Sequence, residues 1–253
     1  MDSSYYSYLT TSQSEPLYNH ATQQKTAPGS TYKIVSATAG LAENVITTST
    51  QILDLGKFEK VSNKPECWIY PRGTHGSINV AEALRHSCNY FFYEVGYDLA
   101  GGNSYNDATG IEKLSKYASM YGLDSKTGVE IEESKPTPAT EFPVMAAIGQ
   151  SDNNFTTISL ARYVTAVANR GKVFQLSLLD KTVDKKGNVV KDYQPELRNE
   201  ITEVSDSTWN AVQQGMEDMV STTGTFDSLR LEGFQMAGKT GTAQQSETHP
   251  DHA

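Results

Sequence analysis

The sequence predicts a mostly helical protein of the α/β class, of the α+β type, with an antiparallel sheet formed late in the chain. Extended stretches on both sides of Lys186-Gly187-Asn188 favour a hairpin with a glycine-containing turn, with strands at 173–183 and 189–193. Five other stretches favour helices, and most of them repeat apolar residues every three or four positions. They cover residues 30–42, 78–100, 111–120, 157–169 and 207–222.

Length and composition exclude several classes of protein. The chain has 253 residues, of which 37% are hydrophobic, enough for one large or two ordinary domains. A formal net charge of -9 argues against general affinity for nucleic acid or for an anionic membrane surface. No run approaches the roughly 18 apolar residues of a membrane span, and residues 1–25 lack the pattern of a signal peptide.

The first 25 residues are rich in Ser, Thr, Tyr and Gln without clear periodicity, so they are predicted to form an irregular arm. Residues 26–253 are predicted to form the main domain. Pro28 disfavours helix in the residue before it and Gly29 permits a tight turn, so the first helix should begin at about Ser30.

The second helical stretch opens with Asn79 and Glu82 at the spacing of a capping box. Whether this helix breaks near Ser87 is left open. The region between the first two helices contains many Gly and Pro residues, which suits loops and short extended pieces. Three later helices end before glycines, as helices often do. These glycines are Gly122, Gly171 and Gly224.

Ser30 and Lys33 form a candidate nucleophile and base. Residues three apart share one helical face, so the Lys33 amine can lie beside the Ser30 hydroxyl. A desolvated lysine has a lowered pKa and can take the serine proton. A lone Ser-x-x-Lys is more often an exposed helical turn, so the assignment depends on two later stretches.

The first of these stretches is Ser87-Cys88-Asn89, a turn that can aim a hydroxyl and a carboxamide into a cleft. The second is 238–242, which places Lys239 among small residues after a strand-like stretch at 233–237. A lysine ammonium and threonine hydroxyls together suit a carboxylate.

A second Lys-Thr-Gly, at Lys126-Thr127-Gly128, is rejected as a decoy. It lies in a turn-rich stretch and runs into Glu130, Glu132 and Glu133, whose charges would oppose carboxylate binding.

Ser-x-x-Lys, Ser-x-Asn and Lys-Thr-Gly occur here in the order typical of penicillin-binding proteins and serine β-lactamases. With these intervals the chain resembles the transpeptidase domain of class B penicillin-binding proteins, of the elongation type (penicillin-binding protein 2-like). The resemblance covers nearly the whole chain. It rests on residues 27–33, 87–92, 147–150 and 237–244.

The resemblance implies a peptidoglycan D,D-transpeptidase that cross-links stem peptides through an acyl-enzyme and is acylated by β-lactams. It implies that Ser30 is the nucleophile, Lys33 its base, Ser87 a proton relay and Asn89 a ligand of the donor amide. It also implies that a terminal carboxylate is bound by the following residues: Lys239, Thr240, Gly241 and Thr242. In the family the oxyanion hole consists of two backbone amides, which map to Ser30 and Thr242.

Two other functions stay open: a penicillin-binding sensor or scaffold without turnover, and a serine β-lactamase. By resemblance, the parent protein belongs on the extracytoplasmic face of the bacterial cell membrane, in a cell-wall synthesis complex, with no nucleic acid partner. No cofactor and no metal are expected, because Cys67, His75, His86 and Cys88 match no compact ligand motif. Zinc held by Cys67, His75 and Cys88 stays an alternative, as does a Cys67–Cys88 disulfide.

The chain departs from the family pattern at Ser151, where relatives often have glycine, and at both ends. The strands that flank the Lys-Thr-Gly strand in the family are expected to be missing, so the chain is expected to be truncated and its sheet incomplete. An unpaired strand edge invites association between copies. Slow acylation and self-association are therefore predicted.

Overall fold

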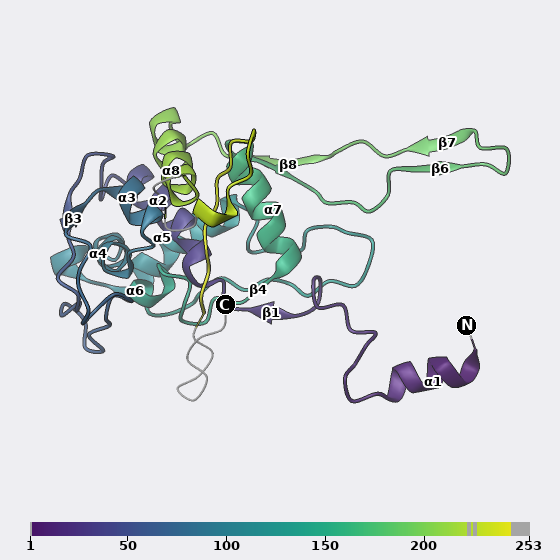
Figure 1. The fold of residues 1–253 in the computed structure, drawn as a ribbon, viewed down its shortest axis with the longest axis horizontal. Helices are drawn as coiled ribbons and strands as arrows, with labels where there is room; N and C mark the ends of the chain where they lie inside the picture. The colour runs from purple at the N-terminus through teal and green to yellow at the C-terminus, as the bar shows by residue number, and fades with distance from the viewer. Residues whose placement is uncertain (1, 222–223, 225–226, 244–253) are drawn as a thin grey trace.

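The computed structural model describes residues 2–221, 224 and 227–243. Most of the described elements are helices, and the α-helices between residues 33 and 219 pack into one body (Figure 1). The α-helices are α1 (Ser3–Thr11), α2 (Lys33–Ala42), α3 (Val80–Arg85), α4 (Asn89–Leu99), α5 (Asp107–Met120), α6 (Pro143–Ala146), α7 (Thr157–Ala168) and α8 (Asp206–Met219). Short 3-10 helices occupy Gly29–Tyr32, Gly102–Ser104 and Asp227–Leu229. No described helix is long and apolar enough to cross a membrane.

Helix α2 is the centre of the helical body. Every side chain from Lys33 to Leu41 is buried, and the helix packs against α4, α5 and α8. Gly40 permits part of this packing, because a Cβ atom there would lie 2.9 Å from Val95 Cγ1 on α4. An apolar helix enclosed on all sides is the expected central element of such a body.

The strands form four two-stranded antiparallel sheets among the described residues. The pairs are β1 (Lys25–Thr26) with β4 (Phe155–Thr156), β2 (Ile52–Leu53) with β3 (Ser77–Ile78), β5 (Lys172–Phe174) with β8 (Leu197–Glu200), and β6 (Lys181–Val183) with β7 (Val189–Asp192). In register, Lys25 faces Thr156 and Ile52 faces Ile78. The helical predominance and antiparallel pairing agree with the predicted class.

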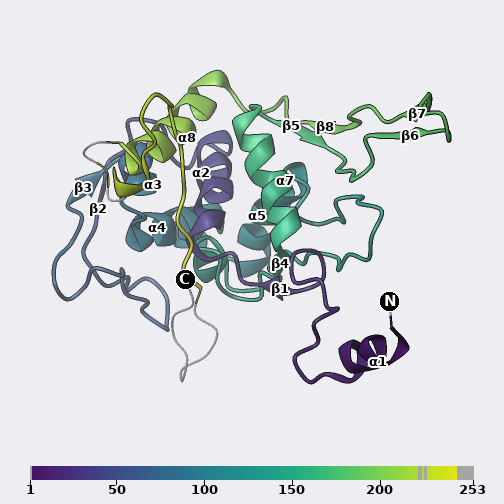
Figure 2. The same cartoon turned by 45° about the vertical axis from the view of Figure 1, so that its right-hand side comes forward.

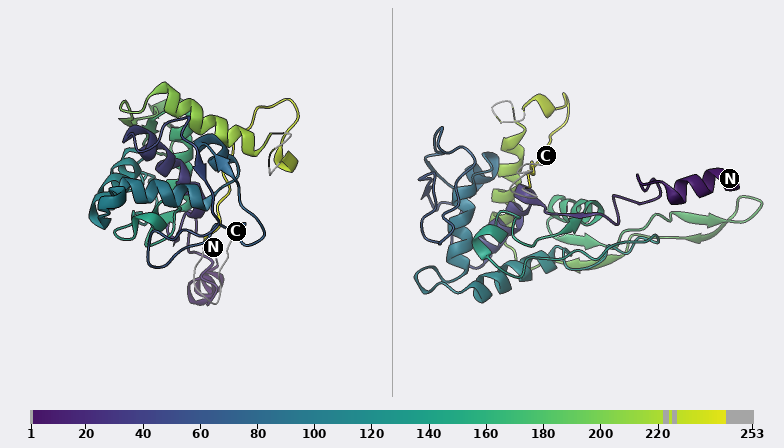
Figure 3. Two further views of the ribbon diagram at one scale, coloured as in Figure 1. Left: turned by 90° about the vertical axis from the view of Figure 1, so that its left-hand side faces the viewer. Right: turned by 90° about the horizontal axis from the view of Figure 1, so that it is seen from below.

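The predicted hairpin is present as β6 and β7, and its turn is closed by the Asp184 carboxylate. That carboxylate accepts hydrogen bonds from the backbone N–H groups of Lys186 and Asn188, at 2.7 and 2.9 Å. The strands are shorter than expected, because 172–174 pairs with β8 instead. Figures 1 and 3 show the β6–β7 ribbon and α1 extending from the same side of the helical body.

The prediction of an irregular N-terminal arm is wrong for residues 3–11, which form α1. Asp2 caps this helix, since its carboxylate accepts the Ser4 N–H at 3.1 Å. The helix buries none of its residues. The division of the chain at residue 25 stays a prediction.

The strand expected at 233–237 is also absent, since this segment belongs to none of the four sheets. It is tied to α8 instead, through the Gly238 N–H, which donates to the Met216 carbonyl at 3.0 Å. Backbone in extended conformation becomes a strand only when a neighbour accepts and donates its hydrogen bonds. The predicted end of the last helix, Thr222, lies outside the described residues, as does Gln244.

Candidate active site

Ser30 lies in the 3-10 turn that leads into α2, so the predicted helix starts tighter than an α-helix. The turn is built on Gly29, which has φ +53° and donates its N–H to the Gly149 carbonyl at 3.1 Å. A Cβ atom on Gly29 would lie 2.2 Å from the Thr242 carbonyl oxygen. Only glycine therefore fits between the Thr242 segment and the turn. Within the described residues the Ser30 hydroxyl makes no hydrogen bond.

Gly149 and Ser151 lie in a second turn, and the carbonyl of Gly149 in this turn accepts the Gly29 N–H. Both have left-handed backbone conformations, with φ of +75° and +63°. The Ser151 hydroxyl donates to the Glu141 carbonyl at 2.8 Å, which stabilises a conformation that glycine adopts more easily. The departure from the family pattern at Ser151 therefore leaves the turn in place.

Lys33, the first residue of α2, is 0% exposed and is held by the Ser87 turn. Its Nζ atom donates to the Ser87 carbonyl at 2.7 Å and to Asn89 Oδ1 at 2.5 Å, and lies 3.3 Å from Ser87 Oγ. Burial lowers the pKa of Lys33 to about 7, against a smaller opposing effect of the Cys88 and Cys67 thiols. An amine with this pKa is in part neutral at neutral pH, as a general base requires.

The helix expected at 78–100 is broken at Ser87, as the sequence left open. The capping box is present at its start, with the Glu82 N–H donating to Asn79 Oδ1 at 3.1 Å. After α3 the chain passes through Ser87, with φ +51°, and resumes as α4 with Cys88 as its N-cap. The left-handed backbone conformation of Ser87 lets the side chains of both Ser87 and Asn89 contact Lys33.

Lys239 reaches the same hydroxyl from the other end of the chain. Its Nζ atom donates to Ser87 Oγ at 2.8 Å and to the Thr240 carbonyl at 3.1 Å. Burial, followed by the charge of Lys33, holds the pKa of Lys239 well below its usual value. Ser87 Oγ thus lies between two lysines, and can accept from Lys239 while it donates to neutral Lys33.

The rest of the Lys-Thr-Gly-Thr segment packs on the nucleophile turn, as the yellow segment beside α2 in Figure 2 shows. A Cβ atom on Gly241 would lie 2.9 Å from Thr31 Cγ2 and 3.0 Å from the Pro28 carbonyl. Thr240 is partly buried and Thr242 is exposed. The structure therefore gathers three stretches that are far apart in sequence: the turn at Ser30, the turn at Ser87 and the segment after Lys239.

The rejected Lys-Thr-Gly at 126–128 binds a carboxylate of its own chain. The Thr127 N–H donates to both Glu133 carboxylate oxygens, at 2.7 and 2.9 Å, and the Gly128 N–H lies 3.3 Å from one of them. Thr127 is fully buried, and Arg162 donates to the Lys126 carbonyl at 2.9 Å. This second motif stabilises a turn and touches none of the site residues above.

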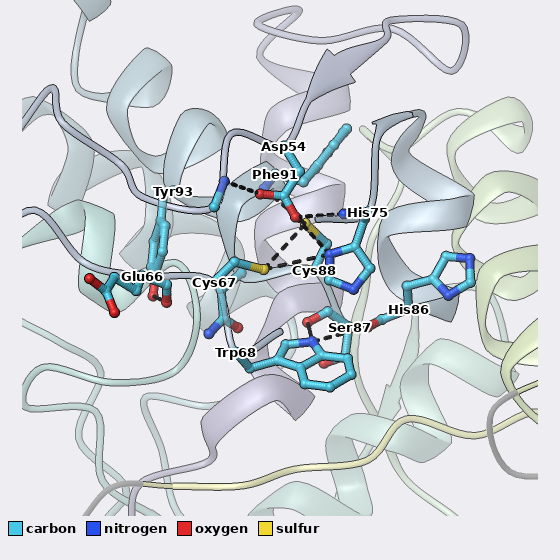
Figure 4. A network of polar contacts seen from close by, with 12 residues as sticks. Asp54, Glu66, Cys67, Trp68, His75, His86, Ser87, Cys88, Phe91 and Tyr93 are labelled. Atoms are coloured by element: carbon cyan, nitrogen blue, oxygen red, sulfur yellow. Dashed lines mark hydrogen bonds and ion pairs between the residues drawn. The ribbon is translucent and has the colours of Figure 1, made fainter. Parts of the chain in front are cut away.

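A cluster of potential metal ligands adjoins the site through Cys88 (Figure 4). The cluster consists of one donor atom from each of four side chains, and these atoms lie within 4.8 Å of one another. The four residues are Asp54, Cys67, His75 and Cys88. Asp54 was not recognised in the sequence, where no local pattern marks it. His86 is not part of the group, although its ring lies 5.7 Å from that of His75.

Three donor spacings in this cluster are close to those of a tetrahedral zinc ion, whereas the spacing between Asp54 and His75 is that of a hydrogen bond. With bonds of about 2.3 Å to sulfur and about 2.0 Å to nitrogen, two sulfur ligands lie about 3.8 Å apart, and sulfur and nitrogen about 3.5 Å apart. Cys67 Sγ lies 3.8 Å from Cys88 Sγ and 3.6 Å from His75 Nδ1. Asp54 Oδ2 lies 3.6 Å from Cys88 Sγ and 2.8 Å from His75 Nδ1. The cysteines are free, since a disulfide needs about 2.05 Å between its sulfur atoms.

The electrostatics of the cluster differ from donor to donor. The hydrogen bond with Cys88 lowers the pKa of the Cys67 thiol to about 5, which favours a thiolate, whereas burial raises the pKa of the Cys88 thiol. Hydrogen bonds from backbone N–H groups and from His75 outweigh burial and lower the pKa of Asp54. His75 Nε2 is buried without a partner among the described residues.

Comparison with known proteins identifies the family. The family model of the penicillin binding protein transpeptidase domain matches residues 2–252. The peptidoglycan D,D-transpeptidase MrdA of Haemophilus influenzae is 29% identical over 94% of this chain and 38% of its own length. Stage V sporulation protein D of Bacillus subtilis is 28% identical over 86% of this chain and 33% of its own length. The chain thus spans between about 33% and 38% of the length of these relatives.

Solved structures share the fold. A Pseudomonas aeruginosa PBP2 structure, in complex with WCK 5153, is 25% identical and covers 97% of this chain and 56% of its own, with a TM-score of 0.76. A penicillin G acyl-enzyme complex of penicillin-binding protein A from M. tuberculosis is 22% identical over 96% of this chain and 53% of its own, with a TM-score of 0.77. The chain therefore belongs to the penicillin-binding protein transpeptidase domain family.

Proposed function

We propose that the protein containing this chain is a peptidoglycan D,D-transpeptidase, and that residues 26–253 are its catalytic domain. The observation that carries the proposal is the hydroxyl of Ser87, which lies between the two lysine amines, Lys33 and Lys239, beside the turn that holds Ser30. The MrdA relatives carry the name of this activity.

In the proposed mechanism neutral Lys33 takes the proton of the Ser30 hydroxyl, and Ser30 Oγ attacks the carbonyl carbon between the two terminal D-alanines. The backbone N–H groups of Ser30 and Thr242 would stabilise the oxyanion. When the tetrahedral intermediate collapses, the carbon–nitrogen bond breaks. The departing D-alanine amine receives the proton from Lys33 through the Ser87 hydroxyl, which leaves an ester on Ser30.

The polar groups around the nucleophile suit a peptide that ends in a carboxylate. Lys239 would bind that carboxylate together with the hydroxyls of Thr240 and Thr242, and Asn89 would bind the amide of the donor peptide. An amine of a second stem peptide then attacks the ester. It takes the acyl group and transfers its proton to Lys33, and Lys33 passes this proton to Ser30 Oγ as the ester bond breaks, which restores the hydroxyl.

The test is covalent labelling with fluorescent penicillin, followed by mass spectrometry of the labelled peptide. We expect the wild-type chain and Ser177→Ala, which removes an exposed serine hydroxyl before β6, to be labelled on the peptide containing Ser30. Ser30→Ala should lose the label. Labelling of Ser30→Ala at another residue would contradict the assignment.

Two further measurements separate the transpeptidase from the other functions. Release of D-alanine from a peptide ending in D-alanyl-D-alanine is expected for a transpeptidase and not for a sensor or scaffold. A penicilloyl adduct that disappears within minutes would indicate a β-lactamase, whereas a transpeptidase is expected to hold it for hours.

We further propose that Asp54, Cys67, His75 and Cys88 hold a zinc ion, which is the alternative left open by the sequence with Asp54 added as a fourth ligand. Four protein donors occupy all positions of a tetrahedral ion, which is typical of structural sites. The ion would anchor Cys88, the residue between Ser87 and Asn89, and would take no part in the chemical steps. Metal analysis of protein purified without chelator should give one zinc per chain, and Cys67→Ala should lose it. Substoichiometric zinc in the wild type would refute the site.

We infer an extracytoplasmic location and a cell-wall synthesis complex for the parent protein. A solved structure with a TM-score of 0.80 is titled as a peptidoglycan synthase complex that coordinates polymerization and crosslinking. The test is labelling of intact cells with a penicillin that does not enter the cytoplasm. Protection of the parent protein from that reagent until the cells are lysed would contradict this location.

A further inference from the structure

Two successive residues of the loop before α3 contact two successive residues of the Ser87 turn (Figure 4). Cys67 lies against Cys88, with their sulfur atoms 3.8 Å apart. The next residue, Trp68, donates its indole N–H to the Ser87 carbonyl at 3.1 Å and lies 3.3 Å from the His86 carbonyl. The loop thus reaches the backbone of the residue whose hydroxyl joins the two lysines.

The Ser87 carbonyl has two donors among the described residues, and they differ in kind. Lys33 Nζ donates to it at 2.7 Å, but the proposed function requires this amine to gain and lose a proton in every acyl transfer. The Trp68 indole is a donor only and does not titrate. Trp68 is therefore the partner of this carbonyl that stays unchanged while the charge on Lys33 changes.

The conformation of Ser87 needs such a partner. A residue other than glycine with φ +51° is strained and persists when its surroundings hold it in place. The position of Ser87 Oγ between Lys33 and Lys239 follows from this backbone conformation. A misplacement of about 1 Å near reacting groups lowers a rate by roughly a hundredfold.

The exposure of Trp68 also indicates that its indole N–H, and not burial of its ring, is what this residue contributes. The side chain is 48% exposed, unlike Trp209, the second tryptophan, which is 3% exposed in the core. A tryptophan that only filled space would bury its ring, whereas this one leaves half of it in solvent and turns its N–H to the Ser87 turn.

We propose that Trp68 is a positioning residue for Ser87: its indole N–H holds the Ser87 carbonyl and thereby keeps the hydroxyl between Lys33 and Lys239. The inference rests on the proposed function, because it assigns Trp68 to the same proton path. Trp68 itself touches no reacting atom in this scheme. Its effect is expected on the rate of acylation rather than on the affinity for penicillin.

The kinetic test compares Trp68→Phe, which keeps a ring but removes the N–H, with Tyr70→Phe on the same loop. Tyr70 is similarly exposed, at 39%, and is not a partner of Ser87. Saturation kinetics with penicillin separate the acylation rate constant from the dissociation constant of the noncovalent complex. We expect Trp68→Phe to lower the rate constant by about tenfold to a hundredfold with little change in affinity. Tyr70→Phe should change neither quantity. An unchanged rate constant, or a change in affinity alone, would overturn the proposal.

A second measurement does not depend on activity. The chain has two indole N–H groups, and their NMR signals are assigned because Trp68→Phe removes one of them. We expect the Trp68 N–H to exchange with solvent at least about tenfold more slowly than a free indole, although half of its ring is exposed. Exchange as fast as a free indole would overturn the contact. A wild-type chain that penicillin does not label would refute the proposed function, and this role with it. Fast exchange or normal acylation in Trp68→Phe, in a protein that is labelled, would refute this role alone.

Discussion

Replacing the buried lysine of the candidate site is expected to stabilise the fold while removing the base. Lys33→Met keeps the length and apolar stem of the side chain and deletes its ammonium group. The wild-type side chain is 0% exposed. A protonated lysine in this position therefore loses its hydration, and the variant avoids that cost.

The magnitude follows from the pKa. Folding lowers the pKa of Lys33 from 10.5 to about 7, and each tenfold change in proton affinity corresponds to about 1.4 kcal/mol. The protonated lysine therefore costs about 5 kcal/mol of unfolding free energy below pH 7. The hydrogen bonds that the variant loses reduce the gain.

The contacts of Lys33 show how large this loss is. The Ser87 carbonyl keeps the Trp68 N–H, and Ser87 Oγ keeps Lys239 Nζ. Only Asn89 Oδ1 loses its donor, at a cost of about 2 kcal/mol for an unsatisfied buried acceptor. A net gain of about 3 kcal/mol remains, which corresponds to a melting temperature roughly 6–12 °C higher for a chain of this size.

The assay is urea unfolding of the wild type and Lys33→Met between pH 6 and pH 10.5, with Lys185→Met on the exposed ribbon as a control for the lost charge. Between pH 7 and 10.5 the unfolded wild type binds a proton that the folded state has released, so wild-type stability rises with pH. The advantage of Lys33→Met should be largest below pH 7, should vanish near pH 9 and should give way to a deficit of about 2 kcal/mol by pH 10.5, because the lost hydrogen bond to Asn89 remains lost at every pH. Equal stability at pH 6, or an advantage that does not fall with pH, would refute the reasoning.

Three further predictions concern the site and its surroundings. The rate of acylation of wild-type protein by penicillin should rise about tenfold per pH unit up to pH 7 and then level off, because burial lowers the pKa of Lys33 to about 7. A rate that does not change between pH 5.5 and 8 would show that another group is the base. Gly29→Ala should slow labelling by more than about a hundredfold, because its Cβ would lie 2.2 Å from the Thr242 carbonyl; normal labelling would show that the segment can shift at little cost. Glu133→Ala should lower the unfolding free energy by about 3 kcal/mol in urea, because three backbone N–H contacts to a carboxylate are lost; a loss below about 1 kcal/mol would show that water replaces the carboxylate.

The sequence by itself determined the local features. The capping box at Asn79 and Glu82, the ends of the helices at glycines and the turn of the β6–β7 hairpin all depend on contacts within a few residues. The rejection of the second Lys-Thr-Gly also followed from its neighbours, although the reason proved different. The acidic residue there does not repel a ligand carboxylate but supplies the carboxylate itself, through Glu133.

Tertiary structure alone decided the break at Ser87, the unpaired segment at 233–237 and the membership of Asp54 in the thiol cluster. Each depends on groups far apart in the chain: Lys33 meets Ser87, Lys239 meets Ser87, and Asp54 meets His75 and Cys88. A residue such as Ser87, with φ +51°, keeps its conformation only when its surroundings hold it in place, and an extended segment becomes a strand only beside a partner. Such states gain their free energy from distant groups, which a local pattern does not contain.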